Sequence, residues 1–183
     1  MFRLQLFLLL TLTNTTLLNA TNYNEDIIKI YSKMLPRFII MSNQKAKIHD
    51  NIEICLLHDS IDKRAAELLS DNINNNYPNG LLNHSIKLIQ SDYNHFKSCK
   101  NVQLMFMFNS DDKHIKDAIL FSQENTLLTM AYDVFLLEKG VDISLFIGRK
   151  VTPYLNMQSI ADKKILLDNI LLRVSKIYVK SDK

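Results

Sequence analysis

The stretch VQLMFMFNSDDKHIKDAILFSQ, residues 102–123, joins two patterns that together decide the fold class. Its first seven residues are apolar almost throughout, which is typical of a strand in the centre of a sheet covered on both faces. The remainder opens with Ser110 and two acidic residues, which favour a helix start, and then carries apolar residues at helical spacing. A buried strand that leads directly into a helix indicates an α/β protein.

The same alternation of strands and helices recurs along the chain. Further runs of strand length lie at residues 52–59, 85–90, 126–132, 142–148 and 151–157. Helical spacing is found at residues 27–38, 62–73, 133–140 and 165–177. Gly140 is the expected stop of a short helix, and Gly148 lies in a three-residue turn that would join the last two strands. We therefore predict a single-domain α/β protein with a mixed, mostly parallel sheet flanked by helices and a late antiparallel hairpin, with Pro153 on an edge strand.

The first twenty residues, MFRLQLFLLLTLTNTTLLNA, have the organisation of a secretory signal peptide. Arg3 precedes an apolar stretch, small polar residues follow, and cleavage is expected after Ala20. A membrane anchor is the weaker alternative, because threonines interrupt the stretch before it reaches spanning length. Residues 21–183 would then form the exported domain, whose near-neutral charge without a basic stripe argues against nucleic-acid binding.

The chain has two cysteines, and both would enter an oxidising compartment after export. Cys55 falls within the first predicted strand, and Cys99 lies just before the third. If those strands are neighbours, a bridge between them is geometrically reasonable. We predict a Cys55–Cys99 disulfide, with two buried, unpaired thiols as the alternative.

No motif in the chain indicates catalysis or a cofactor. There is no nucleophile elbow, no phosphate-binding lysine loop and no dinucleotide fingerprint. The chain has five histidines, and no two of them are spaced to share one helical face, so we expect no metal site: His49, His58, His84, His95 and His114. Because the catalytic and cofactor motifs are also missing, we expect no cofactor and no enzyme activity.

Two polar clusters follow predicted strands and could line a ligand pocket. Asp59 and Ser60 come after the first strand, and Asp111 and Asp112 come after the third. The carboxyl ends of strands are where α/β sheets bind ligands, although the same residues would also cap the helices that follow. Both interpretations stay open on the sequence alone.

The stretch at residues 31–42 is apolar on more sides than one amphipathic face requires. Leu35, Phe38, Ile39 and Met41 could therefore face a partner protein. Burial of these side chains against the sheet is the alternative.

Four segments resemble the YfiR-like family of periplasmic regulators, over about Tyr23 to Val179. They are IEICLLHD (52–59), CKNVQLMFMFNS (99–110), TLLTMAYDVFLLEKGVDISLFIGRKVTPYLNMQSI (126–160) and LLDNILLRVSKIY (166–178). The order of features in the last two segments is the most specific part of the resemblance. It comprises Asp133, Gly140, the turn at Gly148, Asn156, Ile160 with Ala161, and the pair Leu171 and Leu172.

The resemblance implies a periplasmic binding protein that performs no chemistry. Such a protein would hold the periplasmic domain of an inner-membrane diguanylate cyclase or sensor kinase and keep its output, such as cyclic-di-GMP, low. Redox state could act through the two cysteines, and a homodimer at an exposed strand edge is a further expectation. The alternative function is a periplasmic small-ligand-binding or sensor protein.

Overall fold

The computed structural model describes residues 23–179, so the predicted signal peptide at 1–20 lies outside the described residues. The strands are β1 (Asn51–His58), β2 (Ser85–Asp92), β3 (Leu104–Met107), β4 (Leu128–Ala131), β5 (Ile143–Ile147), β6 (Val151–Leu155) and β7 (Lys176–Ile177). The helices are α1 (Glu25–Ile40), α2 (Lys63–Asn76), α3 (Asp112–Glu124), α4 (Leu136–Lys139), α5 (Met157–Asp162) and α6 (Asn169–Val174). Three short 3-10 helices connect them: η1 (Asn43–Lys47), η2 (Ser60–Asp62) and η3 (Phe96–Cys99).

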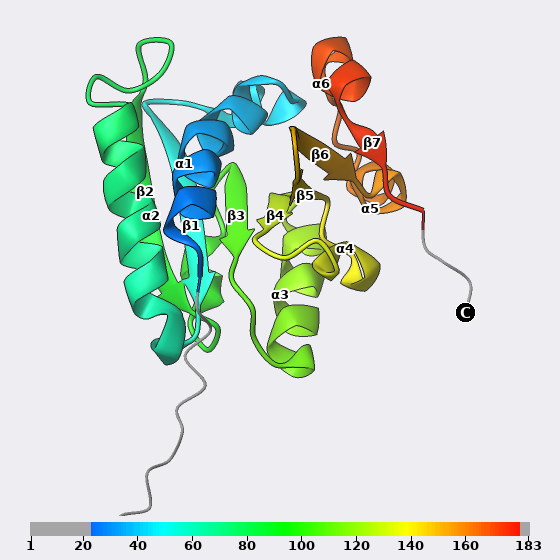
Figure 1. The fold of residues 1–183 in the computed structure, drawn as a ribbon, viewed down its shortest axis with the longest axis horizontal. Helices are drawn as coiled ribbons and strands as arrows, with labels where there is room; N and C mark the ends of the chain where they lie inside the picture. Colours follow the sequence, from blue (N-terminus) through cyan, green and yellow to red (C-terminus); the bar gives the residue numbers. More distant parts are fainter. Residues whose placement is uncertain (1–22, 180–183) are drawn as a thin grey trace, which may run out of the picture.

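One sheet runs through the described residues in the order β2-β1-β3-β4-β5-β6-β7 (Figure 1). The first five strands in the chain are parallel, β6 is antiparallel to β5, and β7 is parallel to β6. The predicted α/β class, with its mostly parallel sheet and late hairpin, is therefore confirmed. No helix among residues 23–179 is long and apolar enough to cross a membrane.

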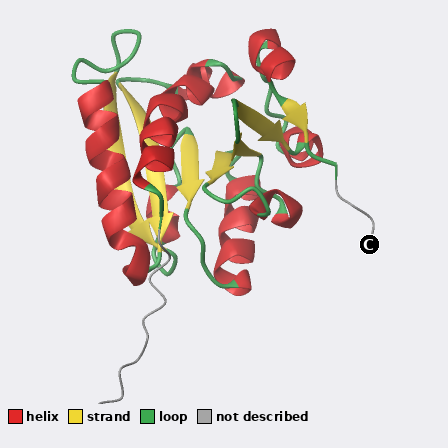
Figure 2. Cartoon of the chain, viewed as in Figure 1, coloured by secondary structure: helices red, strands yellow, loops and turns green. Residues whose placement is uncertain are grey.

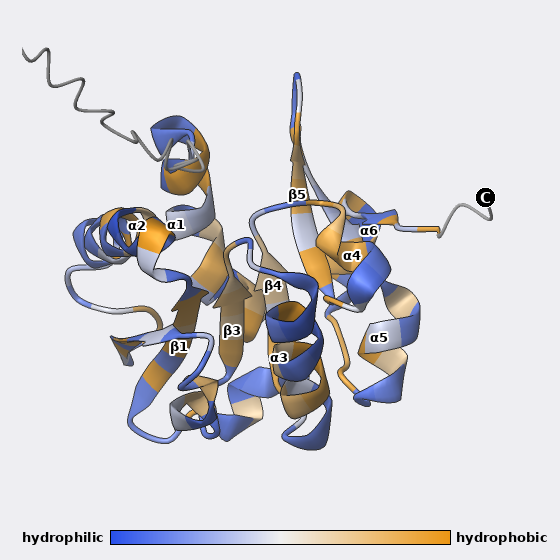
Figure 3. Cartoon of the chain, turned by 90° about the horizontal axis from the view of Figure 1, so that it is seen from below, coloured by the Kyte–Doolittle hydropathy of each residue, from blue (hydrophilic) through white to orange (hydrophobic). Residues whose placement is uncertain are grey.

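Helices cover both faces of the sheet, as Figures 2 and 3 show. Successive side chains of a strand point to opposite faces, so β1 contributes to two separate cores. Ile54 and Leu56 belong to the core under α1 and α2, whereas Cys55 and Leu57 belong to the core under α3. This double burial explains why the central strands are apolar without alternation.

Helix α1 packs on the sheet and alongside α2, so it needs apolar residues on more than one side. Leu35, Phe38 and Ile39 are fully buried in this core, and Met41 is partly buried against it. The prediction that these side chains form a partner surface is wrong for the three buried residues. The excess of apolar positions has a structural cause, because two neighbours cover the helix.

Tyr31 of α1 completes the sheet where β4 and β5 separate. The two strands pair at only two positions, Met130 with Ile143 and Ala131 with Ser144. The Tyr31 hydroxyl lies 2.9 Å from the Ala131 carbonyl oxygen and accepts a hydrogen bond from the Leu145 amide at 3.2 Å. Burial raises the pKa of Tyr31, so the phenol stays protonated and able to donate.

The predicted turns around α4 and the hairpin are confirmed. Gly140 ends α4 in a left-handed conformation with φ of 115°, and residues 148–150 connect β5 to β6. The edge-strand prediction for Pro153 needs correction, because β7 pairs with β6 and makes it an inner strand. The pairing of β6 with β7 begins at Tyr154, so Pro153 lies outside it. The amide hydrogen that proline lacks is therefore not needed for a backbone hydrogen bond to β7.

The predicted closing helix at 165–177 is wrong. The segment forms only the short α6 before it turns into β7, and Ile170, Val174 and Ile177 are exposed instead of sharing a buried face. Backbone hydrogen bonds to the turn after α1 hold the segment before α6 in a non-helical conformation. The Asn43 amide donates to the Leu166 carbonyl, and the Asp168 amide donates to the Met41 carbonyl, both at 2.8 Å.

Candidate functional site

The predicted disulfide is present. Cys55 of β1 and Cys99 of η3 are bonded, with their Cα atoms 5.8 Å apart, and both residues are fully buried. Because η3 leads into β3, which pairs with β1, the bond ties a central strand to the connection that precedes its neighbour. Such a bond is typical of an exported protein.

The strand order reverses direction between β1 and β3, and sheets of this type bind ligands at the carboxyl ends of the strands at that point. Asp59 follows β1 and Asp111 follows β3. Both carboxylates face the ring of His114, whose Nδ1 lies 3.9 Å from Asp59 Oδ1 and 3.2 Å from Asp111 Oδ2. The structure therefore brings together half of the predicted pocket residues.

The other half do not join them. Ser60 is exposed in η2, and Asp112 forms an ion pair of 3.0 Å with Lys139. Asp111 also caps α3, since its Oδ1 accepts a hydrogen bond from the His114 amide at 2.8 Å. This bond is the main reason why the pKa of Asp111 is lowered. Three of the four predicted residues thus have structural or solvent-facing positions, and Asp111 replaces the predicted Ser110 as the helix cap.

A second group lies at the same edge of the sheet, and sequence reasoning missed it. The Tyr23 hydroxyl donates to Asp62 Oδ2 and accepts from the Asn109 amide, with both distances 3.1 Å. The Tyr23 ring meets the rings of Phe108 and Tyr132 edge-on. These residues are far apart in the sequence and form no motif, so no local signal could have revealed the group. We call this arrangement the Tyr23 cluster.

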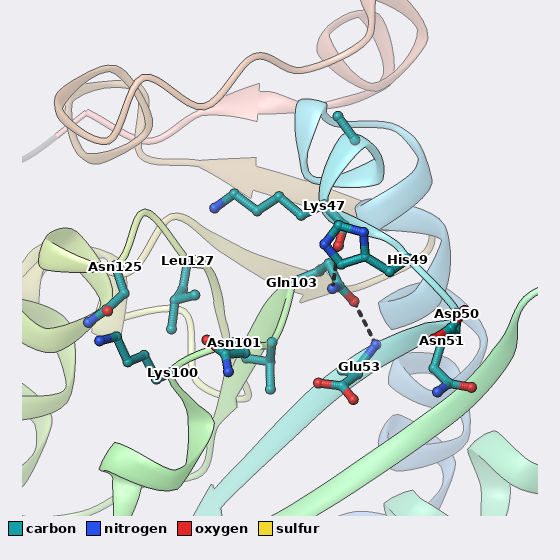
Figure 4. A pocket seen from close by; sticks show the side chains of 12 residues that line it. Lys47, His49, Asp50, Asn51, Glu53, Lys100, Asn101, Gln103, Asn125 and Leu127 are labelled. Carbon is teal, nitrogen blue, oxygen red and sulfur yellow. Dashed lines mark hydrogen bonds between the residues drawn. The ribbon is translucent and has the colours of Figure 1, made fainter.

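A cleft of about 700 Å³ opens at the opposite edge of the sheet, near the amino ends of β1 and β3 (Figure 4). Lys100 and Asn125 lie at one end of it, and Asp50 and Asn51 lie at the other. A volume of this size suits a small molecule. The lining is mainly polar, and it includes Lys47, His49, Glu53, Lys100 and Gln103.

Several polar groups of this cleft already have structural partners. Gln103 accepts a hydrogen bond from the Glu53 amide at 2.6 Å and donates to the Lys47 carbonyl at 3.2 Å. Lys47 Nζ donates to the Thr126 carbonyl at 2.7 Å, and burial lowers the pKa of this lysine. The cleft is thus a polar hollow with a fixed floor.

The closing segment carries the most concentrated apolar surface of the described chain. Six of the twelve large apolar side chains that are exposed in residues 23–179 fall within it, and we call them the C-terminal apolar surface: Leu166, Ile170, Leu172, Val174, Ile177 and Val179. Asn169, Leu172 and Arg173 line a hollow of about 560 Å³ on the same segment. Strand β7 is the last strand of the sheet, so one of its edges is unpaired in the part of the chain described.

Comparison with known proteins establishes the fold class only. No family model and no curated protein matches the chain. A conserved domain protein from Vibrio cholerae O1 biovar El Tor is similar in structure, with a TM-score of 0.61, 9% identity, and coverage of 82% of this chain and 59% of that one. An ABC domain in complex with L-Trp from Streptococcus pneumoniae has a TM-score of 0.56, 9% identity, and coverage of 83% and 60%.

At this identity the likeness concerns the fold alone, and the chain spans about three fifths of the length of either structure. The described residues hold no group of three or more His, Cys, Asp or Glu side chains that could bind a metal. The protein is thus an α/β domain with a buried disulfide, a polar cleft and an exposed apolar segment.

Proposed function

We propose that this chain is an exported regulatory protein of the YfiR-like type, which binds the periplasmic domain of an inner-membrane signalling protein and represses it. The observation that carries the proposal is the C-terminal apolar surface. Exposed apolar side chains in one segment are characteristic of a protein interaction site, whereas isolated ones need no explanation.

Details of the closing region support the resemblance noted in the sequence. Asn156 begins α5, where its side-chain oxygen accepts a hydrogen bond from the Ser159 amide at 3.1 Å and its amide donates to the Leu137 carbonyl at 2.9 Å. Gly140 ends α4, and Leu171 is buried in the core. These three positions of the resemblance thus have structural roles consistent with it.

Such a regulator acts by preferring one conformation of its partner. It can shift the partner's equilibrium only by the difference between its affinities for the two conformations. An apolar surface next to a strand edge that is unpaired within residues 23–179 offers both side-chain contacts and backbone hydrogen bonds for that purpose. The partner of this proposal is a membrane-bound diguanylate cyclase or sensor kinase.

Site-specific photo-crosslinking in the native host tests the proposal. A photoreactive residue at Ile170 should capture a membrane protein with a cyclase or kinase domain, identified by mass spectrometry. The same residue at Leu120, exposed on α3, serves as the matched control and should not capture it. Capture of only a second copy of the chain, or equal capture from both positions, would refute the proposed partner surface.

Binding of a small ligand is a second candidate, favoured by the cleft of about 700 Å³ and by the fold shared with a domain solved with L-Trp. A screen of the purified chain with polar small molecules, amino acids included, would distinguish the two. A rise in melting temperature that a Lys100→Met variant loses would favour the ligand-binding function. No rise, together with crosslinking from Ile170, would favour the regulator.

A further inference from the structure

Charges of opposite sign line the two ends of the cleft at the amino ends of β1 and β3 (Figure 4). Lys100 lies at one end and Asp50 lies at the other. Neither side chain has an ion-pair partner within residues 23–179. Because both border one hollow of about 700 Å³, a single small molecule with a charge at each end can meet both of them.

The cationic end holds a second lysine, Lys47 of η1. Figure 4 shows its side chain extending toward the end at which Lys100 and Asn125 lie. Its Nζ donates to the Thr126 carbonyl at 2.7 Å, which fixes its position and leaves two of its three protons for a ligand. Burial lowers the pKa of Lys47, and a bound carboxylate would favour its charged form. This end of the cleft therefore suits an anionic group.

At the other end, Asp50 is the carboxylate that remains available. The second carboxylate of the lining belongs to Glu53, which forms an ion pair of 2.8 Å with Lys87 of β2. The charges of Glu53 and Lys87 offset each other. The charge of Asp50 is thus left for a cationic group of a ligand.

The walls that carry these charges are held together without a ligand. Cys99 directly precedes Lys100, and its disulfide to Cys55 joins this wall to β1. The Gln103 side chain accepts from the Glu53 amide at 2.6 Å and donates to a carbonyl of η1 at 3.2 Å. These bonds connect β1 and η1 to the segment that enters β3. A site whose walls are fixed in advance loses less free energy to ordering when a ligand binds.

We propose that the cleft is a binding site for an elongated zwitterion, whose carboxylate lies at the Lys47 and Lys100 end and whose amino group lies at the Asp50 end. The proposal rests on the ligand-binding function given above as the second candidate, and it adds the class of ligand and its orientation. Short peptides and ω-amino acids both carry their charges at opposite ends. An α-amino acid carries both charged groups on one carbon atom, so its charges cannot reach both ends of the cleft.

Isothermal titration calorimetry of the purified chain at low salt tests this proposal, with 6-aminohexanoate as the probe. Hexanoate lacks the amino group and 6-aminohexanamide lacks the carboxylate. Each should bind about fivefold more weakly, because an exposed ion pair contributes at most about 1 kcal/mol. Glycine, whose charged groups are adjacent, should bind no better than either. Tighter binding of triglycine than of 6-aminohexanoate would identify a peptide as the source of the zwitterion, and the reverse would identify an ω-amino acid.

Two variants assign the orientation of the ligand. Lys100→Met should reduce the preference for 6-aminohexanoate over 6-aminohexanamide and keep the preference over hexanoate, whereas Asp50→Asn should do the reverse. Lys116→Met, on the exposed side of α3 and outside the cleft, is the matched control and should change neither preference. A merely structural role of Lys100 or Asp50 would weaken the binding of all probes alike, and that result would contradict the proposal.

The outcomes also separate this proposal from the ligand-binding function on which it rests. Equal affinity for 6-aminohexanoate, hexanoate and 6-aminohexanamide would overturn the zwitterion site and leave ligand binding in place. The absence of binding by every probe would overturn the zwitterion site as well. Only the further absence of any stabilising compound in the screen of polar small molecules would refute the ligand-binding function.

Discussion

A buried ion pair between Lys163 and Asp142 joins three elements of the carboxyl-terminal half. Lys163 Nζ lies 2.7 Å from Asp142 Oδ2, and both side chains are fully buried, with 0% exposed. The same ammonium group donates to the Leu127 carbonyl and to Thr129 Oγ1, each at 3.1 Å. Ser159 Oγ donates to the other carboxylate oxygen at 2.7 Å. The pair therefore fixes the end of α5 against β4 and β5.

Removing the cation alone should be severely destabilising. Burial lowers the pKa of Lys163, and the neighbouring Asp142 carboxylate offsets part of this effect. In Lys163→Met that carboxylate stays buried without its counter-charge, so the free energy of unfolding should fall by about 3–5 kcal/mol. Urea denaturation followed by circular dichroism measures it.

Two comparisons separate the loss of the buried counter-charge from the effect of replacing a lysine by methionine in general. Lys116→Met on the exposed side of α3 should leave the urea midpoint nearly unchanged. The double variant Lys163→Met with Asp142→Leu removes both charges and should recover part of the loss. A loss in Lys163→Met no larger than that in Lys116→Met would contradict the assigned role.

At the scale of elements, the disulfide holds β1 to the connection that enters β3. Its residues are separated by 44 positions, so the bond closes a long loop in the unfolded chain. Replacing Cys55 and Cys99 together by alanine should lower the free energy of unfolding by about 2–4 kcal/mol. Denaturant titration of the oxidised and doubly substituted proteins gives the difference.

The burial of both sulfurs also makes a prediction about redox control. Because neither cysteine is exposed, a reductant should open the bond only after local or global unfolding. Full reduction should then lower the melting temperature and weaken partner binding. If both properties stay unchanged in the reduced protein, a regulatory role of the disulfide is refuted.

At the scale of the whole molecule, stability and binding should depend on different parts of the closing segment. Ile170 and Ile177 are 64% and 65% exposed, whereas Leu171 is fully buried. Ile170→Asp with Ile177→Asp should change the free energy of unfolding by no more than about 1 kcal/mol, since surface substitutions are usually within 0.5 kcal/mol each. The same double variant should lose the partner captured from this surface.

Leu171→Asp is the matched contrast. It places a charge in the core under α6 and should strongly lower the melting temperature. Thermal denaturation of the two proteins, together with a crosslinking yield for the double variant, checks both halves of this prediction. Strong destabilisation by the exposed pair would show that these side chains are part of the core.

Local patterns were sufficient for most of the architecture. The apolar run from Leu104 to Met107 and the stop at Gly140 each depend on near neighbours in the chain, and the structure confirms both. The predicted closing helix is wrong, because backbone hydrogen bonds override its helical spacing: the Asn43 amide donates to the Leu166 carbonyl, and the Met41 carbonyl accepts from the Asp168 amide. Periodicity reports the propensity of a segment, but not what that segment packs against.

The sequence by itself thus determined the α/β class, the hairpin and the pairing of the only two cysteines, because these follow from periodicity, turn residues and elimination. Only the tertiary structure decided which polar and aromatic side chains meet. The Tyr23 cluster and the ion pair of Lys163 with Asp142 join residues from separate elements, which strand order and crossover connections bring together. Contacts of that kind leave no spacing in the chain by which they could be recognised.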